Sequence, residues 1–324
     1  MRVFKSWKLA GTLALVGAFL AGCTSTRPPK PVPKPPEDMT PEQRLINMGF
    51  KNTRKNRIYN AQSLNGFFQK IDDRANRQVR IVQIGDSHVR GHMFPAALRQ
   101  KLAARWGSHA MVDKTINYHT TAIAEETGEN GFIFHAKGKN GCTIAYYLNE
   151  NRLDELARLQ PDLIIVSVGT NESHAKFDPV TYWEKLDTFI AGMRSRLAAE
   201  GRDVAFLLTT PPCSHISKTE TVEYVDDEGK VRIDSVKTKV PNPVAADVAS
   251  FQAWYGDRNN IAVWNLYKTV GGKESACNNW WNGGFMAKDG IHYTKTAYTL
   301  QAELLGQAIL DAYDRYRRAK VRYR

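Results

Sequence analysis

Short apolar runs alternate along the chain with longer segments in which apolar side chains recur at helical spacing. The short runs predict buried strands, and the longer segments predict amphipathic helices. We expect strands at 79–84, 163–168, 204–209 and 261–264, and helices at 94–106, 179–200, 244–255 and 295–316. This alternation predicts an α/β fold, in which a mainly parallel sheet carries helices on both faces.

The segment at 214–243 interrupts this alternation. It is polar, and its two short apolar runs, 222–225 and 231–233, flank the charged turn 226–230. This pattern is typical of an inserted β-hairpin. Because the insertion follows a strand, we expect it on the rim of the sheet where such folds bind ligands. The hairpin could help to select the substrate, or it could be a surface extension without a function. Both interpretations stay open.

The first 22 residues have the layout of a secretory signal peptide. Basic residues precede an apolar stretch at 9–21, and Leu20-Ala21-Gly22-Cys23 resembles a bacterial lipobox. Cleavage there would leave Cys23 as a lipidated N-terminus on a membrane. An uncleaved transmembrane anchor is disfavoured, because the stretch is shorter than the roughly 20 residues that span a bilayer. Thr24, where an aspartate would indicate inner-membrane retention, predicts the periplasmic side of the outer membrane if the host is Gram-negative.

Residues 23–38 predict a tether, since 24–38 contain six prolines and no apolar periodicity. Residues 39–324 are long enough for a well-buried core and contain no second Pro- or Gly-rich break, so we expect one domain. We expect this domain to be a monomer.

The formal net charge is +12, and loss of the three basic residues of the signal peptide leaves nine positive charges on the mature side chains. This balance favours a negatively charged neighbour. For an exported lipoprotein, that neighbour would be cell-wall glycan, anionic polysaccharide or lipid head groups. No segment resembles a nucleic-acid-binding module, so no nucleic-acid partner is expected.

Three cysteines remain in the predicted domain: Cys142, Cys213 and Cys277. An odd number in an exported protein allows one disulfide with a free thiol, or three thiols, and the spacing does not choose between them. A disulfide between two of them could brace the rim of the site. No CxxC or His-rich spacing is present, so neither a metal site nor a cofactor is predicted.

Two polar motifs directly follow predicted buried strands. Gly85-Asp86-Ser87 follows the strand at 79–84, and Gly169-Thr170-Asn171 follows the strand at 163–168. The carboxyl ends of parallel strands share one edge of the sheet, so Ser87 and Asn171 are expected to lie close together. A serine hydroxyl at this edge is a candidate nucleophile once a base is nearby.

The motif Asp289-Gly290-Ile291-His292 can supply that base. Imidazole has an unperturbed pKa of about 6.5, which suits proton transfer near neutral pH. At a spacing of three, one tight loop can present both side chains, so that His292 accepts the Ser87 proton and Asp289 holds the other ring nitrogen.

An acyl-transfer site also needs donors for the negative oxygen of its intermediate. The backbone N–H of Ser87, the backbone N–H of Gly141 and the side-chain amide of Asn171 are the candidates. Gly138 lies in the same short segment, Gly138-Lys139-Asn140-Gly141-Cys142-Thr143, and we prefer Gly141.

Other residues near these motifs have supporting roles in this interpretation. Asp86 is expected to fix the nucleophile turn, His88 to tune that turn or to serve as a local structural histidine, and Glu172 to brace the neighbouring loop. Trp280 and Trp281 precede residues 289–292, which we call the catalytic loop. There they could stack on a sugar ring or fill a core.

Taken together, Ser87, Gly141, Asn171 and His292, with Asp289 as the acid, resemble the signature of SGNH-type (GDSL-like) serine esterases over about 80–312. The resemblance implies a three-layer α/β/α sandwich with a flavodoxin-like sheet. The motifs are most similar to those of exported bacterial peptidoglycan O-acetylesterases, and His88 replaces the leucine of the lipase form.

The resemblance implies a serine carbohydrate esterase that removes O-acetyl groups from cell-wall glycan. Three alternatives stay open. An O-acetyltransferase, or an esterase for another acetylated polysaccharide, would use the same residues. A glycan-binding lipoprotein without catalysis would instead use the basic charge and the membrane tether.

Overall fold

The computed structural model describes residues 39–112 and 125–322. The predicted signal peptide, Cys23 and the tether lie outside the described residues. Within the described ranges, no helix combines the length and apolar character needed to cross a bilayer.

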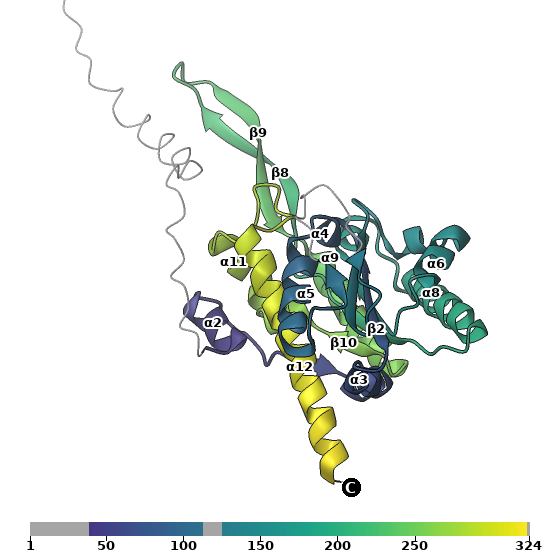
Figure 1. The fold of residues 1–324 in the computed structure, drawn as a ribbon. Helices are drawn as coiled ribbons and strands as arrows, with labels where there is room; N and C mark the ends of the chain where they lie inside the picture. The colour runs from purple at the N-terminus through teal and green to yellow at the C-terminus, as the bar shows by residue number, and fades with distance from the viewer. Residues whose placement is uncertain (1–38, 113–124, 323–324) are drawn as a thin grey trace, which may run out of the picture. The chain divides into compact units, whose positions relative to one another are not determined.

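A six-stranded sheet forms the centre of the fold (Figure 1). From edge to edge, its strands are β1 (Ile58–Tyr59), β10 (Ala262–Trp264), β7 (Ala205–Thr209), β6 (Leu163–Ser167), β2 (Gln78–Gly85) and β5 (Gly131–Gly138). Only β1 is antiparallel to its neighbour, and the other five strands are parallel. The parallel strands have the flavodoxin-like order, which confirms the predicted fold class.

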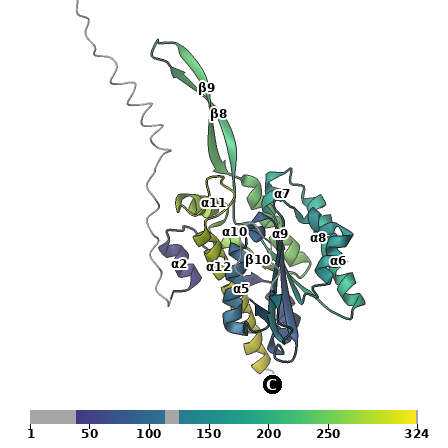
Figure 2. The ribbon, with the colours of Figure 1, turned by 45° about the horizontal axis from the view of Figure 1, so that its top comes forward.

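Helices cover both faces of this sheet, as Figure 2 shows. One face packs against α3 (Asn65–Asp72), α5 (Met93–Trp106) and α12 (Lys295–Arg322), and the other against α6 (Glu150–Ala157), α8 (Pro179–Ala199) and α9 (Pro243–Arg258). The strands are apolar on both sides because each side meets a helical layer: Val79 and Ile81 point into one core and Val82 and Ile84 into the other.

Shorter elements connect these layers. They are α2 (Pro41–Asn47), η1 (Ala61–Leu64), α4 (Ser87–Arg90), β3 (Met111–Val112), β4 (Glu125–Glu126), η2 (Ile144–Leu148), α7 (Thr170–His174), α10 (Leu266–Thr269) and α11 (Gly272–Asn282). The sequence pattern predicted none of these shorter elements, and it also missed the helix α3 and the strand β5. The eight predicted strands and helices are all present, with ends shifted by a few residues.

The predicted hairpin is present and much longer than its apolar runs indicated. Its strands are β8 (His215–Val225) and β9 (Val231–Pro241), which pair in one unbroken antiparallel register. Both views show this ribbon extending beyond the sheet and its helices (Figures 1 and 2).

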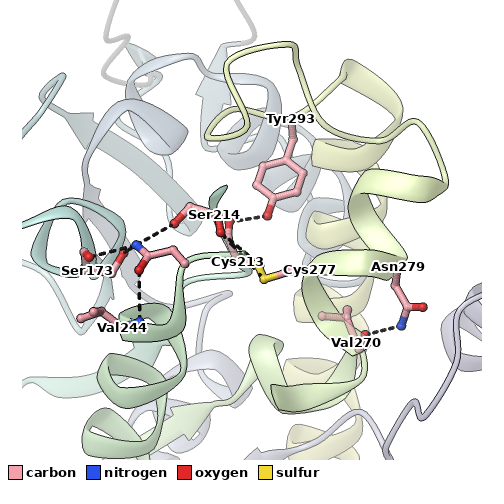
Figure 3. The surroundings of a disulfide bond; sticks show 9 residues. Ser173, Cys213, Ser214, Val244, Val270, Cys277, Asn279 and Tyr293 are labelled. Carbon is pink, nitrogen blue, oxygen red and sulfur yellow. Dashed lines mark hydrogen bonds between the residues drawn. A yellow bond between two sulfur atoms is a disulfide. The ribbon is translucent and has the colours of Figure 1, made fainter. Parts of the chain in front are cut away.

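Covalent and polar contacts hold the base of the ribbon (Figure 3). Cys213, just before β8, forms a disulfide with Cys277 of α11, and the Tyr293 hydroxyl donates to the Cys213 carbonyl at 2.7 Å. After β9, the side-chain amide of Asn242 donates to the Ser173 carbonyl at 2.9 Å. The cysteine pattern left this pairing open, and it resolves as one disulfide with Cys142 as a buried thiol.

Candidate active site

The nucleophile turn lies at the carboxyl end of β2, beside the point where the chain order of the strands reverses. Gly85 pairs with Ser167 of β6 on one side and with Gly138 of β5 on the other. A side chain at Gly85 would lie 2.5 Å from the Ser167 carbonyl oxygen, so only glycine fits there. Ser87 then begins the short helix α4.

Ser87, His292 and Asp289 form a continuous chain of hydrogen bonds. His292 Nε2 lies 2.8 Å from Ser87 Oγ, and His292 Nδ1 lies 2.6 Å from Asp289 Oδ2. Since the carboxylate can only accept, Nδ1 carries the proton and Nε2 is free to accept from the serine hydroxyl. This is the tautomer that a general base requires.

The loop that carries this pair is closed by its own backbone. Asp289 Oδ1 accepts from the N–H groups of Ile291 at 2.8 Å and His292 at 3.0 Å, while Gly290 has the left-handed φ of 71°. Burial favours a higher pKa for Asp289, but the hydrogen bonds from His292 and from the two N–H groups outweigh it and lower the pKa to about 2. Asp289 is therefore ionised whenever His292 acts.

The oxyanion candidates meet at the same edge. The segment before Gly141 lies against the nucleophile turn, because Lys139 N donates to the Gly85 carbonyl at 3.0 Å. Asn171 lies in α7, after β6, and its Nδ2 donates to the Cys142 carbonyl at 2.9 Å. In the described part of the chain, the backbone N–H groups of Ser87 and Gly141 have no acceptor, as expected of groups reserved for an oxyanion.

The structure shows different roles for the two glycines, Gly138 and Gly141, that lie close together in the sequence. A side chain at Gly138 would lie 2.2 Å from the backbone nitrogen of Arg90, so this glycine is needed for packing against α4. Gly141 has a φ of 70°, and apart from its chain neighbours no atom of residues 39–112 or 125–322 lies within 4 Å of where its side chain would stand. The geometry of Gly141 therefore suits a backbone donor that faces a ligand.

Two buried carboxyl groups support the oxyanion loops. Glu172 Oε1 accepts from Ile144 N at 2.8 Å, which ties α7 to the segment after Gly141. Asp86 Oδ1 caps α4 by accepting from His88 N at 2.9 Å, and its Oδ2 lies 3.4 Å from Asn171 Nδ2. Burial raises the pKa of each carboxyl to about 7.

His88 lies behind the catalytic imidazole as a neutral side chain. Its Nδ1 is 2.8 Å from the Tyr298 hydroxyl, and its ring centroid is 5.5 Å from that of His292. Burial, followed by the nearby charge of His292, lowers the pKa of His88 to about 3. These contacts match the structural role that the sequence left open for this residue.

Of the two roles left open for Trp280, the structure supports the core position and contradicts the sugar contact. Its side chain is fully buried, with edge contacts to Phe50 and Tyr293, so it fills the core under the catalytic loop and cannot reach a substrate. Trp281 is 36% exposed, and its contact with a substrate stays a prediction.

The Cys142 thiol is not a rival nucleophile, because burial raises its pKa to about 12.

Three contacts of the site were not predicted. Lys239 Nζ of β9 donates to the Asp289 carbonyl at 2.8 Å, and His215 N of β8 donates to the Gly290 carbonyl at 2.7 Å. The Tyr147 hydroxyl donates to the Gly85 carbonyl at 2.7 Å. The position of the hairpin between a strand and a helix was the only sequence signal for the first two.

No group of three or more His, Cys, Asp or Glu side chains suited to a metal ion occurs within 39–112 and 125–322. The protonated Nδ1 of His292 and the paired Asp289 are engaged with each other, and this arrangement suits nucleophilic acyl transfer by Ser87.

Comparison with known proteins finds a family whose model covers all of these motifs. The family model for GDSL-like lipases and acylhydrolases matches residues 81–305, whereas no curated protein matches the chain. A solved peptidoglycan O-acetylesterase superposes with a TM-score of 0.60 at 17% identity, over 79% of this chain and 99% of that one.

Two other solved structures are less similar. An acetyl xylan esterase has a TM-score of 0.47 at 15% identity, over 71% of this chain and 99% of that one. A protein assigned to the lipolytic G-D-S-L family from Desulfitobacterium hafniense has a TM-score of 0.45 at 15% identity, over 71% and 99%. The TM-score of 0.60 shows a fold shared with the first structure. The family model matches more than half of the chain, so the chain belongs to the GDSL-like lipase/acylhydrolase family.

Proposed function

We propose that this GDSL-type esterase is a carbohydrate O-acetylesterase that removes acetyl groups from cell-wall glycan. The observation that carries the proposal is the hydrogen-bond chain from Ser87 Oγ through the His292 ring to Asp289, at the carboxyl edge of the sheet. Ser87, His292 and Asp289 are the proposed catalytic residues.

Acylation begins when Ser87 Oγ attacks the acetyl carbonyl carbon as His292 Nε2 takes the hydroxyl proton. Asp289 stabilises the imidazolium that forms. The carbonyl oxygen becomes negative and accepts from the N–H groups of Ser87 and Gly141 and from Asn171 Nδ2. His292 then donates its proton to the departing sugar oxygen, which leaves the glycan hydroxyl free and the acetyl group on Ser87.

Deacylation repeats these steps with water. His292 Nε2 accepts a proton from the attacking water, the same donors hold the second oxyanion, and the proton returns to Ser87 Oγ as acetate departs. A sugar hydroxyl in place of water would give the transferase reaction instead.

The substrate class is supported by exposure and by similarity. The side chains of His292 and Asp289 are 32% and 47% exposed, so the reacting centre lies at the surface, where an ester on a polymer can reach it. The structure with the TM-score of 0.60 is described as a peptidoglycan O-acetylesterase. The positive net charge suits a glycan that carries carboxylates.

Acetate release tests the proposal. Purified protein and a Ser87→Ala variant are incubated with O-acetylated peptidoglycan, acetylated xylan and a chromogenic acetate ester. We expect the parent to release acetate fastest from peptidoglycan, and Ser87→Ala to lose at least about a thousandfold in kcat. Activity on xylan alone would overturn the cell-wall assignment while keeping the mechanism.

An added glycan acceptor tests the transferase alternative in the same assay. Faster transfer of acetyl to the acceptor than to water would replace the esterase assignment. No acetate release from any ester, with all binding retained by Ser87→Ala, would favour a glycan-binding protein.

We also propose that Cys23 is the lipidated N-terminus and holds the domain on the periplasmic side of the outer membrane. The lipobox-like sequence and the proline-rich segment support this proposal. A Cys23→Ser variant should move from the membrane fraction to the soluble fraction, and an unchanged distribution would overturn the anchor.

A further inference from the structure

The ribbon of β8 and β9 has two faces of different chemistry. In antiparallel strands, directly paired residues lie on the same face and alternate residues lie on opposite faces. The pairs Ser217–Lys239, Thr219–Lys237 and Thr221–Ser235 therefore share one face. All six side chains are exposed. We call these residues the lysine–hydroxyl face: Ser217, Thr219, Thr221, Ser235, Lys237 and Lys239.

The opposite face over the same length is mixed. It contains Lys218 and Glu220, which form an ion pair at 3.1 Å and so offset each other's charge, together with Val222 and Val236. The six residues of the lysine–hydroxyl face include no acidic or apolar side chain, and the face ends at the next pair on the same side, Glu223–Ile233, which has one of each. In the described residues, Lys237 has no ion-pair partner within reach, so its charge is available to an anion.

This face begins at the catalytic loop. Lys239 Nζ donates to the Asp289 carbonyl at 2.8 Å, and the preceding pair on the same face includes His215, whose N–H donates to the Gly290 carbonyl at 2.7 Å. The His215 ring also packs on Trp281 with centroids 4.7 Å apart. The base of the ribbon therefore lies against the loop that carries Asp289 and His292.

The base of the ribbon is fixed in this position. The Cys213–Cys277 disulfide holds the start of β8, and the hydrogen bond from Asn242 to Ser173 holds the end of β9 (Figure 3). Two-stranded ribbons twist strongly, so only the pairs near the base keep the orientation of Lys239. The three pairs of the lysine–hydroxyl face span about 14 Å along the strands.

We propose that the lysine–hydroxyl face is an extended subsite for the glycan polymer, on which sugar hydroxyls bond to Ser and Thr and the carboxylates of the polymer pair with Lys237 and Lys239. This inference rests on the proposed function and narrows its substrate to an anionic polymer. Serine and threonine hydroxyls both donate and accept, as sugar hydroxyls do, and an unpaired lysine attracts carboxylates.

The test compares Lys237→Glu with Lys218→Glu, which makes the same charge change on the opposite face of the same ribbon. The first readout is the ratio of kcat/KM on soluble O-acetylated peptidoglycan chains to kcat/KM on nitrophenyl acetate. We expect Lys237→Glu to lower this ratio about tenfold, with the loss shrinking at high salt, and Lys218→Glu to change it less than about twofold.

The second readout does not need catalysis. Ser87→Ala protein, with and without each charge change, is sedimented with insoluble peptidoglycan at several salt concentrations. Reduced binding with Lys237→Glu alone supports the subsite, whether or not the parent releases acetate. Equal binding by all three proteins, or an equal ratio for both charge variants, overturns the subsite and leaves the esterase proposal standing.

Discussion

The tautomer of the His292 ring is set by one hydrogen-bond partner on each ring nitrogen. Asp289 accepts from Nδ1 and is itself held by two backbone N–H groups, so it stays ionised and cannot turn away from the ring. Nε2 is thereby left to accept from Ser87. The whole arrangement needs only four consecutive residues and one serine from a distant strand end.

Asn171→Ala should reduce kcat about a hundredfold to a thousandfold, because it removes one donor from the developing oxyanion. KM for a small acetate ester should change little, since the neutral carbonyl of the ground state gains less from that donor. Steady-state kinetics checks whether kcat falls while KM stays nearly constant, and thermal unfolding is the control for folding. A fall in kcat of less than about tenfold would remove Asn171 from the oxyanion site.

Glu172→Gln should make the protein more stable relative to the parent as the pH rises. The folded pKa of Glu172 is about 7, against an ordinary value of 4.5, so the native state binds the extra proton between these values. The parent therefore loses stability from about pH 4.5 to 7, by up to about 3 kcal/mol from this group. Gln keeps the acceptor for Ile144 N and carries no charge.

Urea unfolding of both proteins at about pH 5 and about pH 7.5 measures this difference. The gap in the free energy of unfolding should widen in favour of Glu172→Gln at the higher pH. A gap that is constant or narrows would show that the buried carboxyl is not protonated near neutrality.

The positions of candidate site residues were predictable where a polar residue directly follows a buried strand. Ser87 and Asn171 follow continuous apolar runs, and those runs fix where the side chains emerge. Trp280 shows the limit, because an aromatic residue before a loop has the same pattern whether it faces solvent or the core. Its burial depends on Phe50 and Tyr293, which no local pattern connects to it.

At the scale of elements, buried parallel strands were the easiest to predict and exposed or edge strands the hardest. β5 lies at the edge of the sheet, and its apolar run is interrupted by His135 and Lys137. The ribbon strands face solvent on both sides, so only the part near the turn carries an apolar signal. Elements without a continuous buried side leave little periodicity in a sequence.

Replacing both Cys213 and Cys277 by serine should lower the free energy of unfolding by about 4 kcal/mol, because the disulfide spans 64 residues and its loss enlarges the unfolded ensemble. Urea denaturation with and without reductant measures the effect. Reductant should destabilise the parent and leave the double variant unchanged. Equal midpoints for the parent in both conditions would show that the disulfide contributes little to stability.

At the scale of the whole molecule, the strand order brings the distant motifs together. The chain leaves β2 toward β5 on one side and reaches β6 on the other, so the loops after β2, β5 and β6 border one crevice at the switch point. The alternation of strands and helices predicted this edge. It did not predict that α11 and the ribbon base would also pack around the catalytic loop, since those contacts join segments without a shared pattern.

The central claim is that Ser87 carries the acetyl group between the two halves of the reaction. Mass spectrometry of the peptide that contains Ser87, after rapid acid quench of the protein with an excess of acetate ester, tests it most directly. We predict a transient acetyl group on Ser87 in the parent, and neither acetylation nor turnover in Ser87→Ala. Acetylation of a different residue, or turnover that persists in Ser87→Ala, would contradict the account.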